Sequence, residues 1–455
     1  MKKSVKIIII VVLLLLLGLL IYYLIDRNTP RNETLTIATI WDVPNPENME
    51  HGLDFTSSSA QVQEARRGFV KAMNDFGGKL NVEEIQIAEN ENLRGFVTDI
   101  AEIYTTEDIL MTIGASSDEK TMYTAMEMEY FQIPMLIPFS DGDLVVQNSE
   151  IRGNYIVRLT PNTEQYANFF GTKLLSSSLF EVINLVLFNN GVIPDYNIDV
   201  AVFFMNNFNG HNMAVQITQS IMDNNYNIEV YEPFDLNKLK SAASTAWQTN
   251  EEKLEAAEVV IIIAEDYDPL SDLKDVYKLW SDRGLSPSFI TVGYRPDYDD
   301  QDLLNASNLF MVVPDINFTK CPADVNTRPM AMGYAAGYVT SKALATALSK
   351  TPAEPHGLQR LFMSPDKRME SHQNYLTQFR SAIISAMLSI NEDVPCYGKV
   401  NLSTTDSTEW INLSLVRYNG NHIYESVSPS VVYNPIIDKL RDEFGLSSDT
   451  GEVFQ

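Results

Sequence analysis

The sequence predicts an α/β protein of two Rossmann-like lobes with parallel sheets, preceded by one transmembrane helix. Its 455 residues are too many for one small core and suit two lobes of ordinary size. Apolar strand-like runs alternate with helical patterns along most of the chain, which is typical of parallel sheets covered by helices. An apolar run of about twenty residues near the N-terminus is long enough to cross a bilayer as a helix.

The first lobe is expected over residues 34–159. Its strands are TLTIATI, NVEEIQIA, DILMTIG and IPMLIP, and they alternate with helical patterns at about 60–76, 93–104 and 118–131. Such alternation predicts right-handed crossovers between parallel strands. This lobe is expected to be completed by about 312–404, which includes a helical run at 329–350 and a helix-rich insert at about 352–391.

The second lobe is expected over residues 160–311, because the same pattern starts again after YIVRLTP. Helices are predicted at about 164–175, 212–222 and 270–281, among the strands DVAVFF, NIEVYEP, VVIIIA, SFITVG and LFMVVP. The near-continuous apolar run VVIIIA is typical of a strand covered on both faces. Residues of about 405–430 complete this lobe, and 431–455 form a C-terminal tail.

The N-terminal segment 1–30 is predicted to be a short cytoplasmic stub and a membrane anchor. Lys2, Lys3 and Lys6 precede the apolar run Ile7–Ile25, and positive charge on that side places the N-terminus in the cytoplasm. Neither a small-residue cleavage site nor a cysteine follows the run, which favours an uncleaved anchor over a signal peptide. We therefore expect a single-pass cell-membrane protein with an extracytoplasmic folded body.

Composition and motifs exclude several functions. The net charge of −27 would repel phosphate backbones, so a nucleic-acid partner is not expected. The sequence has no GxSxG motif, P-loop, dinucleotide fingerprint or HExxH, so we expect no enzyme activity and no cofactor. Cys321 and Cys396 lack zinc-site spacing, so no metal site is indicated, and they form either one disulfide or two buried free thiols.

Several segments, in collinear order, resemble the branched-chain amino-acid-binding branch of the type I periplasmic-binding-protein superfamily, whose members are ABC transporter receptors. They are ARRGFVKAMNDFGG, IGASS followed by IPMLIPFSDGD, NGHNMAVQITQSIMDNN, KLWSDRGLSPSFITVG, YAAGYVTSKALATALSK and a final GKVNL…LVRYNG hairpin. The resemblance covers about Leu35 to Tyr424. It implies a type I periplasmic-binding fold with a ligand between lobes that are joined by three crossings, near Leu159, Val312 and Thr404.

Candidate ligand-binding residues lie after the carboxyl ends of predicted strands, where ligands meet open parallel sheets. The alternatives at these positions are ordinary ones: core packing for Trp41, a helix cap for the serines, a turn after IPMLIP and a solvated acidic loop in the second lobe. The candidates are Trp41, Ser116, Ser117, Phe139, Ser140 and Asp141 in the first lobe and Phe208, Asp266, Tyr267 and Tyr294 in the second.

These observations predict a solute-binding protein that captures a small polar ligand for an ABC importer. The ligand is an amino acid or another small polar solute, although the acidic residues that hold an ammonium in the family's amino-acid binders are replaced here by residues such as Gly293 and Tyr294. The partners expected are an ABC permease and the membrane, and the protein is expected to be a monomer. The anchor and the 352–391 insert keep open a sensor or a structural partner on the same fold without transport.

Overall fold

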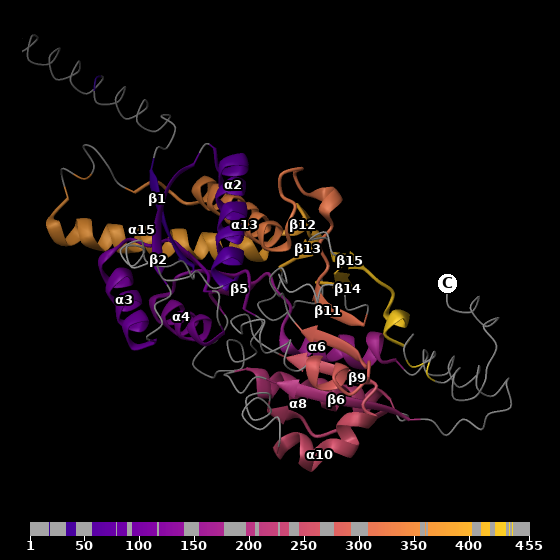
Figure 1. Ribbon diagram of the computed structural model, residues 1–455. Coiled ribbons are helices and arrows are strands. Elements are labelled where there is room, and N and C mark those ends of the chain that lie inside the picture. Colours follow the sequence, from indigo (N-terminus) through magenta and orange to yellow (C-terminus); the bar gives the residue numbers. More distant parts are fainter. Residues whose placement is uncertain are drawn as a thin grey trace, which may run out of the picture.

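The structure is a computed structural model, and its described residues form two large sheets, each with helices packed on it, and a small two-stranded sheet (Figure 1). It describes residues 18, 33–41, 57–78, 80–88, 93–115, 118–140, 154–176, 197–204, 209–225, 228–235, 245–263, 277–292, 308–354, 360, 363–402, 411–418, 424–433, 436 and 439. The expected anchor lies outside these ranges except for Gly18, and the helices within them include none with the length and apolarity to cross a bilayer. The anchor therefore stays a prediction.

Lobe 1 is built on a five-stranded sheet of order β2-β1-β3-β4-β5 in which all neighbours are parallel. Helices cover both faces and bury the apolar side chains that point alternately up and down from the strands. The strands are β1 (Thr34–Trp41), β2 (Asn81–Ala88), β3 (Met111–Ile113), β4 (Met135–Ile137) and β5 (Ile156–Arg158). The helices are α2 (Ser57–Gly77), α13 (Arg328–Lys350) and α15 (Pro365–Leu388) on one face and α3 (Leu93–Thr106) and α4 (Asp118–Phe131) on the other.

Lobe 2 is built on an eight-stranded sheet of order β15-β14-β11-β10-β9-β6-β7, with β8 beside β6. All pairs among β6 to β11 are parallel, whereas β14 and β15 are antiparallel additions at one edge. The strands are β6 (Ile198–Phe204), β7 (Ile228–Val230), β8 (Phe234–Asp235), β9 (Val259–Ile263), β10 (Ser288–Val292), β11 (Leu309–Pro314), β14 (Leu413–Tyr418) and β15 (Tyr424–Ser426). The helices are α6 (Thr163–Phe169), its π-helical extension η2 (Phe170–Leu174), α8 (Gly210–Asn224) and α10 (Thr245–Ala256).

The expectation that GKVNL and LVRYNG pair as a hairpin is wrong. The first of these segments forms β13 (Gly398–Asn401), which pairs instead with β12 (Asn391–Val394) in a separate two-stranded sheet beside lobe 1. Gly398 has a φ of +83°, which favours glycine and allows the tight turn between β12 and β13. The second segment is β14, which pairs with β11 in lobe 2. The sequence reading also missed helix α10 and strand β15.

The chain passes between the two lobes three times. The first crossing follows β5 and leads into α6, and the second follows β11 and leads through η3 (Phe318–Lys320) into α13. The third lies between Leu402, which belongs to the core of lobe 1, and Leu413, which starts β14 in lobe 2. Two lobes joined in this way can move relative to each other by hinge bending.

Helices α2 and α13 pack with their backbones nearly in contact, because glycines face each other's main chains. A Cβ on Gly333 would lie 1.8 Å from the Ala65 carbonyl oxygen, and one on Gly68 would lie 2.0 Å from the Met330 carbonyl oxygen. Gly337 of the YAAGYV segment is needed for the same reason, because a Cβ there would lie 2.6 Å from the carbonyl oxygen of Phe69 in the ARRGFV segment.

Helix α15 lies across the amino ends of the lobe 1 strands and is bonded to several of them. Arg380 donates to the Ile109 carbonyl just before β3 and to the Phe131 carbonyl before β4, and the Tyr375 hydroxyl donates to Glu33 before β1. His372 lies between Glu354, 3.1 Å from Nδ1, and Asp108, 2.9 Å from Nε2. The helix-rich insert thus closes the amino edge of the sheet.

Replacing Gly333 with alanine is expected to destabilise the protein by about 1–3 kcal/mol, because the new methyl group would overpack the α2–α13 contact. Gly95→Ala is the matched control: it lies in helix α3 with nothing within 4 Å of its Cβ position. That change should stabilise by about 0.5–1 kcal/mol through helix propensity. Urea denaturation measures the free energy of unfolding of both variants. Equal effects of the two substitutions would contradict the close packing of α2 on α13.

The His372 contacts are expected to stabilise the fold more at low pH than at high pH. Partial burial lowers the pKa of His372, but hydrogen bonding and charge attraction to Asp108 and Glu354 outweigh it, so the pKa is raised above its usual value. The nearby Arg380 has its pKa lowered, mainly by burial. A raised folded-state pKa means that the stabilisation is complete below a pH of about 6.5 and is lost as the pH rises through the folded-state pKa.

His372→Gln tests this expectation, because glutamine keeps hydrogen-bonding capacity but does not take up a proton in this range. The free energy of unfolding of the two proteins, measured from pH about 5 to about 9, should differ most at the acidic end. A difference that is constant with pH would show that the imidazolium contributes nothing beyond its hydrogen bonds.

Candidate functional site

The carboxyl edges of the two sheets face each other across the boundary between the lobes. The first crossing leaves lobe 1 from the carboxyl end of β5, and the second leaves lobe 2 from the carboxyl end of β11. Because β1 to β5 are all parallel, and β6 to β11 are as well, the carboxyl ends of all these strands lie on the same side as the crossings. This edge is where ligands bind in open parallel sheets.

Trp41 and Phe139 are brought together at the lobe 1 edge. Trp41 ends β1, and its ring lies 5.7 Å from that of Phe139 and 5.8 Å from that of Phe69 on helix α2. Only 1% of Trp41 is exposed, yet its indole N–H has no hydrogen-bond partner. Trp41 thus packs in the core of lobe 1, the alternative expected for this residue, and its buried N–H can meet a ligand only where a movement of the lobes exposes it.

Ser140, at the same edge, holds the segment after β4 in place through hydrogen bonds within the protein. Its hydroxyl donates to the carboxylate of Asp118, the first residue of α4, and its carbonyl accepts a 2.6 Å hydrogen bond from Nη1 of Arg158. All three side chains are at least 95% buried. The hydroxyl of Ser140 is therefore engaged within the protein, and its role here is to hold the segment after β4 in place.

Gly114 explains how the segment after β3 reaches this edge. Its φ is +119°, and a Cβ there would lie 2.3 Å from the carbonyl oxygen of Ile40 in β1. Only glycine allows both this backbone conformation and this approach. The residue thus brings the start of the IGASS segment against the end of β1, next to Trp41.

Asn209 and Thr163 lie at the lobe 2 edge, where helices α8 and α6 begin. Asn209 precedes helix α8, is completely buried, and donates a 3.5 Å hydrogen bond from Nδ2 to the hydroxyl of Thr163 at the start of α6. Its amide oxygen has no partner. Lobe 2 therefore has a buried acceptor near its carboxyl edge.

Three of the ten sequence candidates, Trp41, Phe139 and Ser140, lie in the described residues, and the structure places all three at the lobe 1 edge. Ser116, Ser117, Asp141, Phe208, Asp266, Tyr267 and Tyr294 lie outside the described residues. They stay predictions.

Sequence reasoning missed Asp118 and Arg158, which hold the edge together. Arg158 carried a usable signal, because a charged residue inside the apolar strand YIVRL must be paired when the strand is buried. Asp118 looked like an ordinary acidic residue in the first turn of a helix, and only its contact with Ser140 distinguishes it.

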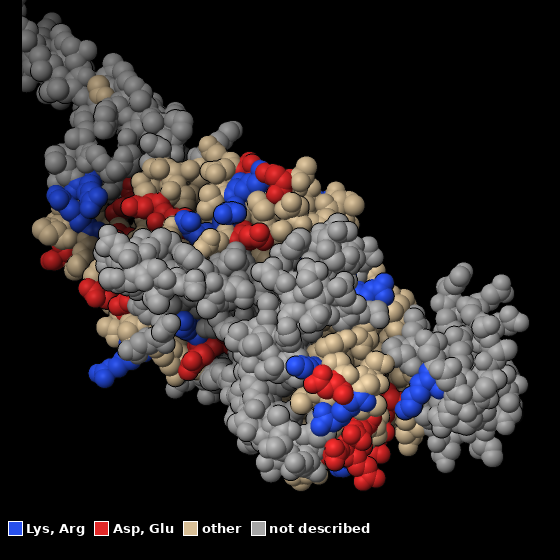
Figure 2. Space-filling model, viewed as in Figure 1, with Lys and Arg blue, Asp and Glu red and all other residues tan. Residues whose placement is uncertain are grey.

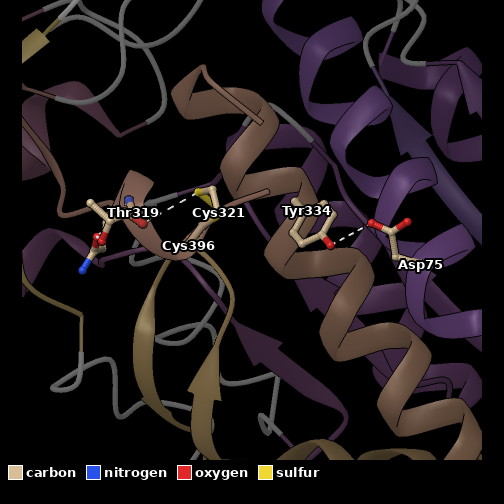
Figure 3. The surroundings of a disulfide bond; sticks show 6 residues. Asp75, Thr319, Cys321, Tyr334 and Cys396 are labelled. Atoms are coloured by element: carbon tan, nitrogen blue, oxygen red, sulfur yellow. Dashed lines mark hydrogen bonds between the residues drawn. A yellow bond between two sulfur atoms is a disulfide. The ribbon is translucent and has the colours of Figure 1, made fainter. Parts of the chain in front are cut away.

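The two cysteines form a disulfide, which resolves the alternative that the sequence left open. Cys321 follows η3 on the second crossing, and Cys396 lies in the turn between β12 and β13 (Figure 3). The bond thus joins two segments of lobe 1 that are 75 residues apart and lie next to the crossings.

Two surface pockets lie on helices of lobe 1 rather than at the edge described above. One, of about 490 Å³, runs along α2, where Lys71 already pairs with Asp324 at 3.1 Å. The other, of about 470 Å³, lies along α15. Among the described residues on the face shown in Figure 2, basic side chains lie beside acidic ones. The candidate site is placed at the facing edges, because ligands bind at the carboxyl edges of open parallel sheets and these pockets lie on the helices α2 and α15.

Solved structures with the same arrangement of elements are solute receptors. An extracellular ligand-binding receptor from Rhodopseudomonas palustris superposes with a TM-score of 0.57 at 12% identity, covering 87% of this chain and 100% of its own. A leucine-binding protein from Thermotoga maritima superposes at 0.55 and 13% identity, covering 86% and 97%. No protein-family model and no curated protein matches the sequence.

A third structure is the branched-chain amino acid transporter substrate-binding protein of Streptococcus pneumoniae in complex with isoleucine, with a TM-score of 0.53 at 10% identity and coverage of 87% and 98%. Identities this low show a shared fold. The chain has the type I periplasmic-binding fold, which the sequence resemblance implied, and it spans nearly the whole length of these receptors.

Replacing Trp41 with phenylalanine is expected to cost less stability than the same change at Trp280. Nε1 of Trp280 donates a 2.8 Å hydrogen bond to the Leu254 carbonyl in the last turn of α10, and losing it leaves a buried acceptor unpaired. The indole N–H of Trp41 has no such bond to lose. In denaturant titrations Trp280→Phe should cost about 1–3 kcal/mol more. Equal costs would mean that the Trp41 N–H is satisfied in the ligand-free protein.

Proposed function

We propose that the protein captures a small polar solute between its two lobes and presents it to an ABC importer. The observation that carries this proposal is the pair of facing carboxyl edges joined by three crossings, because a solute that touches both edges stabilises the closed arrangement. The shared fold supports the same reading, since the similar structures are named as receptors or substrate-binding proteins of transporters.

The described edges indicate the kind of solute. The Trp41 indole offers a donor from lobe 1, and the Asn209 amide oxygen offers an acceptor from lobe 2. The rings of Trp41 and Phe139 offer an apolar wall beside them. A small molecule with both an acceptor and a donor next to an apolar part fits this set, and amino acids meet that description.

The remaining sequence candidates complete the proposed site. Ser116, Ser117 and Asp141 are proposed to contact the solute from lobe 1, and Phe208, Asp266, Tyr267 and Tyr294 from lobe 2. The division of the chain at about residues 159, 312 and 404 is proposed as the boundary of the moving bodies.

We further propose that the chain is held at the outer face of the cell membrane by the helix at residues 7–25. The folded body starts at Glu33, which accepts a 2.7 Å hydrogen bond from the Tyr375 hydroxyl. The seven residues between the apolar run and Glu33 span at most about 25 Å. The amino edge of lobe 1 would therefore lie near the bilayer, and a permease in the same membrane would be within reach of a monomer.

A panel of amino acids and related polar solutes should contain one that raises the melting temperature of the full-length protein in detergent. At a concentration of 100 Kd the added stability is about 2.7 kcal/mol. Trp41→Phe should weaken binding about tenfold, the effect of losing one hydrogen bond in a desolvated site. Trp280→Phe is the matched control and should keep the full shift, because Trp280 lies in the core of lobe 2.

Failure of every solute at millimolar concentration would contradict the receptor proposal. In another outcome, a solute binds while no permease co-purifies with the protein after cross-linking in the native membrane. This result would support the proposal that the protein is a solute receptor and contradict the proposal that it serves an ABC importer. That outcome would favour the sensor alternative.

A further inference from the structure

The second crossing is fixed to one lobe up to Asp315 and to the other from Asn317. On the lobe 2 side, Pro314 pairs with Leu413, and the Asp315 N–H donates a 2.8 Å hydrogen bond to the Asn412 carbonyl. On the lobe 1 side, the Asn317 N–H donates a 2.8 Å hydrogen bond to the carbonyl of Cys396. Ile316 is the one residue between these two backbone hydrogen bonds, and its side chain is buried against helices α2 and α13 of lobe 1.

The lobe 1 side of this crossing is braced by several independent contacts. The disulfide joins Cys321 to Cys396, and Lys320 pairs with Asp393 at 3.1 Å. Figure 3 shows the disulfide beside η3 and, further along the same segment, Tyr334 of α13 pointing at Asp75 of α2, with a hydrogen bond of 2.8 Å. The chain from Asn317 into helix α13 is thus held as one body with lobe 1.

Arg328 makes a contact across Ile316. It begins helix α13 in lobe 1, is 4% exposed, and donates a 2.7 Å hydrogen bond from Nη1 to the carbonyl of Pro314, the last residue of β11 in lobe 2. Its guanidinium carbon lies 5.9 Å from the centre of the Phe318 ring. A rotation about Ile316 changes the distance between Arg328 and Pro314, whereas it leaves the contacts within each lobe unchanged.

We propose that Ile316 is the pivot of the second crossing and that Arg328 is a latch that holds the lobes in the arrangement seen here. The inference rests on the proposed closure of two lobes but needs no knowledge of the solute. Hydrogen bonds from charged donors are stronger than neutral ones, so losing this bond is expected to shift the ratio of two lobe arrangements about tenfold. Arg328 is a positioning residue, acting on the ligand only through the lobes.

The test measures the distance between lobes in the full-length, ligand-free protein. Spin labels are placed at Ser381→Cys on α15 and Glu251→Cys on α10, both exposed, and the two native cysteines are protected in the disulfide. Double electron–electron resonance gives the distance distribution. Arg328→Met should add a second distance or broaden the distribution. Lys320→Met is the control, because its ion pair lies entirely on the lobe 1 side, and it should leave the distribution unchanged.

Two substitutions at Ile316 test its role as the pivot. Ile316→Ala and Ile316→Gly both remove the side chain, but only glycine frees the backbone, so the glycine variant should show the broader distribution. If the Arg328→Met variant does not fold, the comparison of the Ile316→Ala and Ile316→Gly distance distributions tests the proposal by itself. Unchanged distributions in Arg328→Met and Ile316→Gly, or an equal change in Lys320→Met, would overturn the proposal. Because no solute is added, a failed solute screen would leave this result intact.

Discussion

The direction of the strands is the constraint on which this structure depends. In a parallel sheet every strand ends at the same edge, and here the crossings leave from that edge in both lobes. The strand ends at Trp41, Ile113 and Ile137 in lobe 1 therefore lie at the edge that faces the strand ends at Phe204, Ile263 and Val292 in lobe 2. A site shared by two bodies follows from the topology before any side chain is considered.

The opposite edge of the lobe 1 sheet, the amino edge, is closed by helix α15. This difference between the two edges supports the placement of the site at the carboxyl edges. Helix α15 bonds the segments that precede β1, β3 and β4 through Tyr375, Arg380 and His372. Side chains from one long helix thus satisfy backbone carbonyls and carboxylates at the amino edge. At the carboxyl edge, the indole N–H of Trp41 and the amide oxygen of Asn209 are buried without partners, as are side-chain atoms of other described residues such as Oδ1 of Asn225.

Much of this could be predicted from the sequence, because periodicity is local. Helix α4 runs over Asp118–Phe131 as expected, and the all-apolar run VVIII is the fully buried strand β9. What failed was long-range pairing: β13 and β14 read as one hairpin, but the first turns back at Gly398 onto β12 and the second continues the sheet of lobe 2. Likewise the wall formed by Trp41 and Phe139 was foreseeable from strand ends, whereas the Ser140, Asp118 and Arg158 network depends on residues from three separate elements.

The hinge and the site depend on each other through the same few residues. Arg158 precedes the first crossing and holds the segment after β4, while Arg328 follows the second crossing and holds the end of β11. Each arginine is buried and bonds a backbone carbonyl at the edge where the ligand is expected. The Arg158 bond lies within lobe 1, but the Arg328 bond spans the two lobes, so a change in the angle between the lobes alters the Arg328 bond, and a ligand that draws the two edges together must change that angle. Two lobes that were merely tethered would lack this coupling, which is what allows a small solute to control the relative position of two large bodies.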